Sequence, residues 1–99
     1  MTAYAIFIRD EPAHDPDGLA LYQKMNGENI SAYLAHGIKP IAVYGAIETL
    51  EGPAPDGTII LQFPSIADAK AWYNSPEYQA ALPHRLNASE YRAFIVEGL

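Results

Sequence analysis

The strand-like segments of this chain are apolar on both of their faces. In residues 2–9 the two sets of alternating positions are Ala3, Ala5, Phe7 and Tyr4, Ile6, Ile8. Residues 39–50 and 91–97 alternate in the same way and also place apolar side chains on both sides. A strand with one face in water alternates apolar with polar residues instead. The pattern therefore predicts a sheet that is covered on both faces.

Helix signals lie between these segments. Asp15 followed by Pro16 is typical of a helix start, and Gly37 is typical of a left-handed C-terminal cap. We expect one helix from residue 16 to about residue 36, weakened by about 1 kcal/mol at Gly27, where a bend or close packing is expected. Residues 58–63 predict a third strand, which ends at a proline because proline cannot donate to the sheet.

Two shorter helices are predicted after this third strand. Ser65, with Asp68 three residues later, resembles a capping box and starts the first of them. The pair Ser75–Pro76 combines an N-cap with proline at the first helical position, so it predicts a break and a new start. We expect Pro83 to end the new helix after about two turns, because its ring clashes with the preceding turn. The resulting order is βαββαβ, an α+β, ferredoxin-like fold with a four-stranded antiparallel sheet.

The predicted topology leaves one face of the sheet without a cover. Right-handed crossovers place both helical segments on the same face. Leaving the other face in water would forgo roughly 1.5–3 kcal/mol for each large apolar side chain. A second copy of the sheet is the simplest cover, so we expect a homodimer in which two sheets pack face to face.

One run of residues carries a family resemblance. The run Ala71–Gln79 reads AWYNSPEYQ, and it is accompanied by Phe63–Ser65, Arg85 and Val96–Gly98. Together they resemble the domain-of-unknown-function family numbered 1330, of the dimeric α/β-barrel superfamily. The resemblance spans nearly the whole chain. It implies a ferredoxin-like fold and a dimeric barrel, and it implies no agreed activity.

Composition narrows the classes of function. Twelve acidic against six basic residues give a formal charge of −6, which argues against nucleic acid and anionic membranes as partners. The absence of cysteine excludes disulfide and thiolate chemistry and favours a reducing, cytoplasmic location. No signal segment is visible, and no apolar run approaches the roughly 20 residues that span a bilayer. We expect residues 1–99 to form a single domain.

Aromatic residues offer the clearest ligand-binding candidates. We predict a pocket between sheet and helices, lined by Tyr33, Tyr44, Trp72 and Tyr78. The alternative for Trp72 and Tyr78 is ordinary core packing beneath the helix break. Arg85 is predicted at the polar end of the pocket, where a guanidinium could bind a carboxylate through two hydrogen bonds.

An ion pair is the alternative role for Arg85. The acids within its predicted reach are Asp68, Glu77 and Glu97.

Candidates for acid–base chemistry are weaker. Tyr44 and Glu51 would supply a hydroxyl and a base, or else a barrel-wall aromatic and a solvated turn acid. His36 suits a general base by residue type, although a helix C-terminus also favours a histidine cation for structural reasons. His14 and His84 have no metal-ligand spacing, and no Ser-His-acid pattern can be assembled. We therefore expect neither a metal nor a cofactor.

Three functional hypotheses remain open at this point. The first is a homodimer that binds a small aromatic or carboxylate-bearing molecule between sheet and helices. The second, by analogy of fold alone, is a cofactor-free enzyme of the monooxygenase or isomerase type. The third is a structural or interaction module without a ligand.

Overall fold

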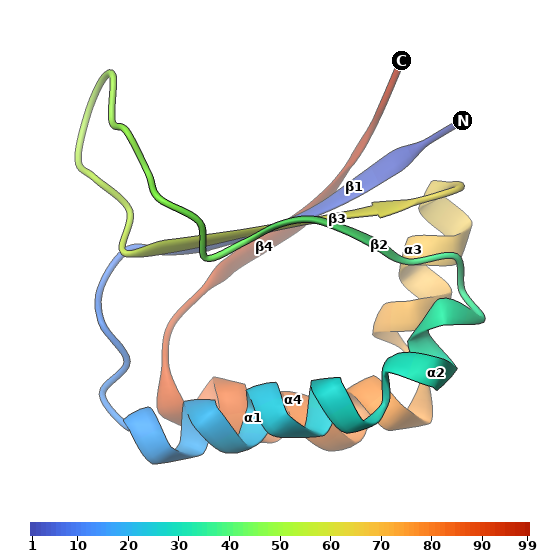
Figure 1. Ribbon diagram of the computed structural model, residues 1–99, viewed down its shortest axis with the longest axis horizontal. Helices are drawn as coiled ribbons and strands as arrows, with labels where there is room; N and C mark the ends of the chain where they lie inside the picture. The colour runs from blue at the N-terminus through green and yellow to red at the C-terminus, as the bar shows by residue number, and fades with distance from the viewer.

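A computed structural model describes residues 1–99 and contains four strands and four helices. In chain order these are β1 (Ala3–Arg9), α1 (Pro16–Glu28), α2 (Ile30–Leu34), β2 (Lys39–Val43), β3 (Gly57–Phe63), α3 (Ile66–Tyr73), α4 (Pro76–Ala88) and β4 (Arg92–Glu97). The strands form one antiparallel sheet in the order β2-β3-β1-β4. All helices lie on one side of it (Figure 1). The predicted ferredoxin-like α+β fold is confirmed.

The two faces of β1 have the predicted character. Ala3, Ala5 and Phe7 are buried toward the helices, whereas the intervening residues are only partly covered. On the outer face, Ile6 lies opposite Ile60 of β3 and Phe94 of β4. We call the side of the sheet away from the helices the open face. This apolar row crosses three strands, and Phe94 and Val96 remain 47% and 44% exposed.

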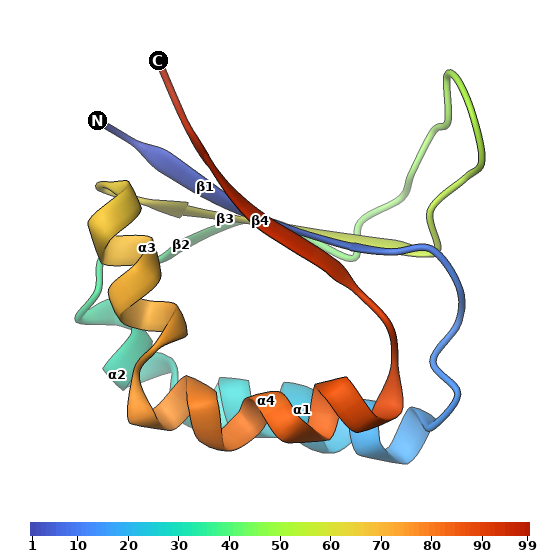
Figure 2. The same ribbon diagram turned by 180° about the vertical axis from the view of Figure 1, so that it is seen from behind.

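The helical layer has two parts, which we call the floor (α1 and α4) and the upright end (α2 and α3). Helices α1 and α4 run side by side below the sheet, and α2 and α3 rise to it at one end (Figures 1 and 2). The predicted start at Ser65 is confirmed, because its hydroxyl accepts a hydrogen bond from the Asp68 amide at 3.1 Å. The predicted break at Ser75 is also confirmed, with α4 beginning at the next residue and the Ser75 hydroxyl accepting from the Tyr78 amide at 3.3 Å. None of the helices is long and apolar enough to cross a membrane.

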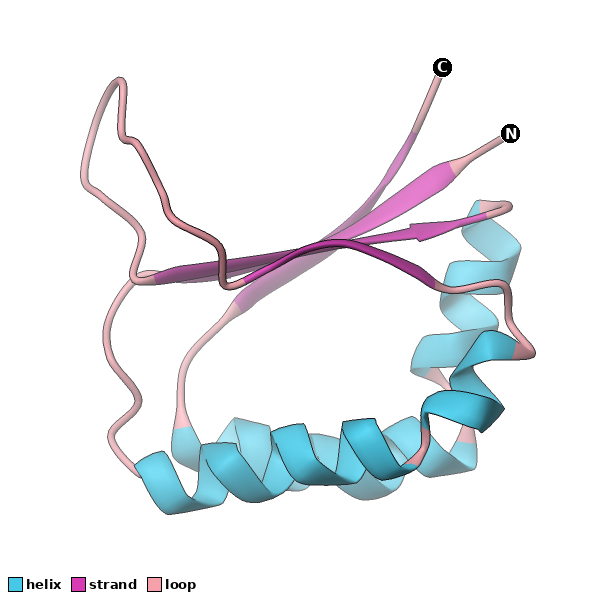
Figure 3. Ribbon diagram, in the orientation of Figure 1, coloured by secondary structure: helices cyan, strands magenta, loops and turns pink.

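The first helical segment differs from the single helix predicted over residues 16–36. Helix α1 ends at Glu28 and α2 begins at Ile30, on either side of Asn29, whose φ and ψ are −96° and 9°. The interruption thus falls at Asn29, two residues after the glycine at which a bend was expected. This turn redirects the chain upward to the sheet (Figure 3) and buries Tyr33.

Strand β2 is shorter than predicted. The expected strand over residues 39–50 ends at Val43, because Tyr44 adopts a left-handed backbone with φ of 53°. That conformation turns the chain out of the sheet plane and begins a long loop over residues 44–56, which rises on the side of the open face (Figure 1). The pairing of β2 with β3 shifts in register between Pro40 and Ala42.

Helix α4 is longer than predicted. It continues through Pro83 to Ala88 rather than ending after two turns. Pro83 lies on the exposed side of the helix, where water can satisfy the carbonyl that loses its partner. The opposite side buries Tyr78, Leu82 and Arg85. That burial outweighs the local cost of proline and places Arg85 on a helix.

Aromatic side chains fill the space between the sheet and the floor. Trp72 is at the centre, with its ring centroid 4.3 Å from that of Tyr78 and 5.4 Å from that of Phe63. Phe7 of β1 meets the same indole edge-on at 6.2 Å. Long side chains of this kind let α1 and α4 lie well below the sheet and still pack against it.

Candidate ligand-binding cavity

A cavity of about 230 Å³ lies between β2, β3 and the first two helices. Most of the residues around it are hydrophobic. Its walls include Phe7, Tyr33, Ile38, Tyr44, Leu61 and Trp72. Cavities of about 150 Å³ lined by apolar residues are large enough for benzene. This cavity therefore has room for a single-ring organic molecule with one polar substituent.

Trp72 contributes an unsatisfied hydrogen-bond donor. The residue is only 3% exposed, and its indole Nε1 has no hydrogen-bond partner. A buried polar group without a partner costs roughly 1–3 kcal/mol. An acceptor oxygen that reached Nε1 would remove that cost, and Trp72 is one of the residues that line the cavity.

Tyr33, which was also predicted to line the pocket, already uses its hydroxyl in a hydrogen bond within the protein. The Tyr33 hydroxyl donates to Asn26 Oδ1 at 2.8 Å, and both residues line the cavity. Burial raises the pKa of Tyr33 above that of an ordinary phenol. Tyr33 is therefore a neutral wall residue whose proton is directed to Asn26.

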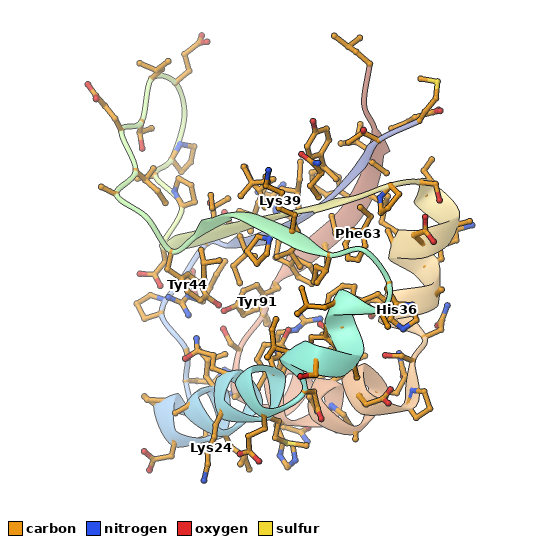
Figure 4. All side chains as sticks on the ribbon, turned by 45° about the vertical axis from the view of Figure 1, so that its right-hand side comes forward. Lys24, His36, Lys39, Tyr44, Phe63 and Tyr91 are labelled. Carbon is orange, nitrogen blue, oxygen red and sulfur yellow. The ribbon has the colours of Figure 1, made fainter.

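Tyr44 belongs to a chain of polar groups below the sheet. Its hydroxyl lies 2.5 Å from that of Tyr91, which in turn accepts a hydrogen bond from Arg9 Nη1 at 3.1 Å. Arg9 Nε is paired with Asp56 Oδ2 at 2.7 Å. Figure 4 shows both phenol rings on the helical side of the sheet. Of the members of this chain, only Tyr44 lines the cavity.

The electrostatics of this chain favour a neutral Tyr91 phenol beside a permanent cation. Burial and the hydrogen bond with Tyr44 raise the pKa of Tyr91. The Arg9 guanidinium lies 5.1 Å from the centre of the Tyr44 ring. Burial lowers the pKa of Arg9, but Tyr91 and Asp56 more than offset it, and the net pKa lies above its ordinary value. The Arg9 guanidinium therefore stays protonated, so that its charge and its N–H donors are always present.

Arg85 is a second buried cation, and no carboxylate pairs with it. It is 3% exposed, and the two ion pairs of the structure join Arg9 to Asp56 and Arg92 to Asp10. The ion pair considered as its alternative role is therefore wrong. Its guanidinium instead lies over aromatic rings, and Nε has no partner. The ring centres are those of Phe7 at 5.5 Å, Tyr22 at 5.7 Å and Tyr91 at 5.0 Å.

Arg85 and Tyr78 lie next to the cavity without lining it. Phe7 and Tyr22 line the cavity and also contact the Arg85 guanidinium, so these two rings stand between them. Tyr78 is fully buried, and its hydroxyl lies 2.8 Å from that of Tyr22. Burial raises the pKa of Tyr78 strongly. Arg85, which was predicted at the polar end of the pocket, thus lies as a cation behind the cavity wall.

The remaining predicted residues lie elsewhere. His36 follows α2 at the upright end of the molecule (Figure 4), and Glu51 is exposed in the loop over residues 44–56. Neither lines a cavity. The structure therefore brings together Tyr33, Tyr44 and Trp72.

Sequence reasoning missed Arg9, Tyr22 and Tyr91 as members of this constellation. Arg9 and Tyr91 are 82 residues apart, and Tyr44 and Tyr91 are 47 apart. The available signal was the antiparallel pairing of the first and last strands, which places Ile8 opposite Arg92. Extending that register by one residue would have placed Arg9 beside Tyr91.

A larger cavity of about 650 Å³ lies near the junction of α4 and β4. Its residues are mostly polar, and Arg92 and Asp10 in its wall are already paired with each other. Its His14 Nε2 is 2.9 Å from the carbonyl oxygen of Asn87. Because Arg92 and Asp10 already pair with each other and the other acids, Glu11 and Glu90, are exposed, this hollow has less to offer a small organic ligand than the aromatic cavity.

Comparisons with known proteins agree on the family and the fold. Residues 2–99 match the model of the family described as Domain of unknown function (DUF1330). No curated protein matches the sequence.

Solved structures with the same fold come from several bacteria. The protein of unknown function RPA0582 from Rhodopseudomonas palustris is 21% identical, with a TM-score of 0.72 over 99% of this chain and 82% of that chain. A dimeric ferredoxin-like protein of unknown function from Jannaschia is 9% identical, with a TM-score of 0.70 over 99% and 100%. A putative antibiotic biosynthesis monooxygenase from Nitrosomonas europaea is 10% identical, with a TM-score of 0.57 over 99% and 89%. At these identities the similarity shows the fold alone.

Proposed function

Because this chain belongs to the DUF1330 family, whose description assigns no activity, we propose a function from the geometry of its cavity. We propose that it binds a small, single-ring organic molecule bearing a carbonyl or carboxylate oxygen, between the sheet and helices α1 and α2. The cavity and its aromatic walls support binding over a module without a ligand.

The observation that carries this proposal is the lone indole N–H of Trp72. It is buried and has no partner in the protein, in the wall of a mainly apolar cavity. Sites for small molecules combine such apolar walls with a few polar groups that orient the ligand. A ligand oxygen that accepts a hydrogen bond from Nε1 satisfies this donor. The ring of the ligand then contacts the apolar walls of the cavity in place of water.

Trp72 also provides the measurement, because it is the only tryptophan. We expect single-ring carboxylates, amides and ketones to change its fluorescence in a saturable way. The variant Val43→Phe, which adds a ring to the cavity wall, should weaken this binding by at least about tenfold, or about 1.4 kcal/mol. Leu21→Phe on the exposed side of α1 is the matched control, since Leu21 does not line the cavity. A panel that leaves the emission unchanged would refute the proposal.

We also propose that two copies associate through their open faces. The apolar row of Ile6, Ile60 and Phe94 supports this, and several proteins of the same fold are described as dimeric. Light scattering on the eluting protein should give about twice 10.8 kDa at micromolar concentration. A monomeric mass would contradict the association.

A cofactor-free enzyme is the second candidate. The chain of polar groups that joins Arg9, Tyr91 and Tyr44 supports it, because aligned donors in a cavity can stabilise charge that develops on a substrate oxygen. The similarity in fold to a putative monooxygenase adds only the architecture. Mass spectrometry of panel compounds after incubation with the protein, in air and without oxygen, tests for turnover. Recovery of every bound compound unchanged would leave binding as the function.

A further inference from the structure

We infer that the ligand of the aromatic cavity is an anion and that its charged oxygen accepts a hydrogen bond from the Tyr44 hydroxyl. This inference rests on the proposed function, because it names the ligand class of the same cavity. It draws on three features: the direction of the donor chain, the backbone of Tyr44, and the buried charge behind the cavity wall.

The direction of the chain follows from its first member. A guanidinium can only donate, so the Tyr91 oxygen accepts from Arg9 Nη1 at 3.1 Å. The Tyr91 proton can then be given to the Tyr44 oxygen, 2.5 Å away. In this arrangement the Tyr44 proton has no acceptor within the chain, and Tyr44 lines the cavity. Hydrogen bonds arranged in sequence polarise one another, which makes the last hydroxyl a better donor to an anion.

The backbone holds Tyr44 where the chain needs it. A φ of 53° is uncommon for an aromatic residue, and the Tyr44 amide is fixed by donating to the Thr58 carbonyl at 3.0 Å. Gly57 provides the space for the ring, since a Cβ there would lie 2.9 Å from Tyr44 Cδ1. Residues kept in such conformations by their surroundings concentrate at binding and active sites. The position of the hydroxyl is therefore fixed by the neighbouring strand β3.

Buried charge gives the ligand its sign. Two guanidinium groups lie over the Tyr91 ring, with Arg9 at 5.8 Å and Arg85 at 5.0 Å from its centre. Asp56 balances Arg9, but no carboxylate balances Arg85. The interior beside the cavity thus carries an uncompensated positive charge. An anion in the cavity offsets that charge through Phe7 and Tyr22, whereas a neutral ligand does not.

The size of the cavity limits the anion to one ring, so benzoate is the simplest probe. Benzamide has nearly the same shape without the charge and serves as its neutral counterpart. We expect the wild-type protein to bind benzoate at least about tenfold more tightly than benzamide. Tyr44→Phe should weaken benzoate binding by about ten- to a hundredfold, because a hydrogen bond to a charged group is lost, and should affect benzamide less.

Two further variants separate this role from a structural one. Tyr91→Phe keeps the ring but interrupts the chain, so it should reduce the benzoate-to-benzamide preference by a smaller factor, about threefold. Tyr73→Phe is the matched control, because its hydroxyl makes no hydrogen bond within the protein and Tyr73 does not line the cavity. It should leave the preference unchanged. If Tyr44→Phe does not fold, the preference measured with Tyr91→Phe decides.

The outcomes distinguish this inference from the proposed function. Equal affinity for benzoate and benzamide, or a preference unaffected by both chain variants, would overturn the inference and leave ligand binding standing. Binding of neutral panel members in the absence of benzoate binding would do the same. Failure of every panel compound to change Trp72 fluorescence would overturn both.

Discussion

The two faces of the sheet are both largely apolar, yet they differ in the polar groups that lie among the apolar side chains. The helical face holds Trp72, Tyr44 and Tyr91 together with two buried or half-buried guanidinium groups. Its donors are either directed at a specific acceptor, as Arg9 is at Tyr91, or left without one, as Trp72 Nε1 is. The open face presents the apolar row of Ile6, Ile60 and Phe94, and its polar residues, such as Gln62 and Arg92, lie in the neighbouring rows. Directed polar groups select a ligand, whereas an undirected apolar surface favours association with a similar surface.

This difference arises from alternation along single strands. Neighbouring residues of β1 point to opposite faces, so Phe7 enters the aromatic layer while Ile6 faces outward. The same strand thus serves two environments. Changes on one face should therefore affect association, and changes on the other should affect stability and binding.

The largest effect is expected on the open face. Ile60→Asp places a carboxylate at the centre of the proposed interface, and each copy would bury it without a partner. We expect the dissociation constant of the dimer to rise by at least about a hundredfold, because an unpaired buried charge costs several kcal/mol. Light scattering should show a folded monomer, with circular dichroism as the check on folding. Ile60→Val is the control, and a dimeric Ile60→Asp variant would show that another surface associates.

A loss of stability is expected from the hydroxyl pair on the helical face. Tyr78→Phe leaves the buried Tyr22 hydroxyl without its 2.8 Å partner. We expect the free energy of unfolding to fall by about 1–3 kcal/mol in urea denaturation. Tyr4→Phe on the open face, whose hydroxyl makes no hydrogen bond to other side chains, should change it by less than about 0.5 kcal/mol. Equal losses of unfolding free energy in Tyr78→Phe and Tyr4→Phe would show that the two faces do not differ as described.

Alkaline pH should affect the helical face selectively. Burial raises the pKa of Tyr78, and burial also raises that of Tyr91, above the ordinary phenol value of about 10. At a pH between the pKa of the phenol in the unfolded state and its pKa in the folded state, the unfolded state has lost the proton and the folded state keeps it. Stability is therefore full below pH about 10 and falls as pH rises, by up to about 1.4 kcal/mol per pH unit for one such group.

Denaturation between pH 8 and pH 11.5 measures this loss. Tyr91→Phe should reduce the slope, since it removes one of the groups with a raised pKa. A stability that stays constant or rises through this range would contradict the assignment.

The smallest effect is expected from Arg85→Met. Methionine preserves much of the side-chain volume and removes a charge that no carboxylate balances. The lost contacts with three aromatic rings are offset by the desolvation cost that disappears. We expect the free energy of unfolding to stay within about 1 kcal/mol of the wild type. A loss of 3–5 kcal/mol, typical of a broken buried ion pair, would show that Arg85 has an acidic partner.

Local signals in the sequence were sufficient for most of the elements. Side-chain caps such as Ser65 and Ser75 act on amides three residues away, so their consequences can be predicted without knowing the fold. The end of β2 at Tyr44 and the continuation of α4 through Pro83 were predicted wrongly. Both depend on distant contacts, with Thr58 and Tyr91 for the first and with the buried aromatic layer for the second.

The amino-acid sequence alone predicted the alternation of the strands, the break at Ser75–Pro76 and the aromatic content of the interior, because each follows from residues within a few positions of one another. It also identified Tyr33, Tyr44 and Trp72 as wall residues of a cavity. The connection of Tyr44 to Tyr91 and Arg9, and the place of Arg85 behind the wall without a carboxylate, became visible only in the folded molecule. Those features depend on strand register and helix placement, which are settled by packing between segments 47 to 82 residues apart.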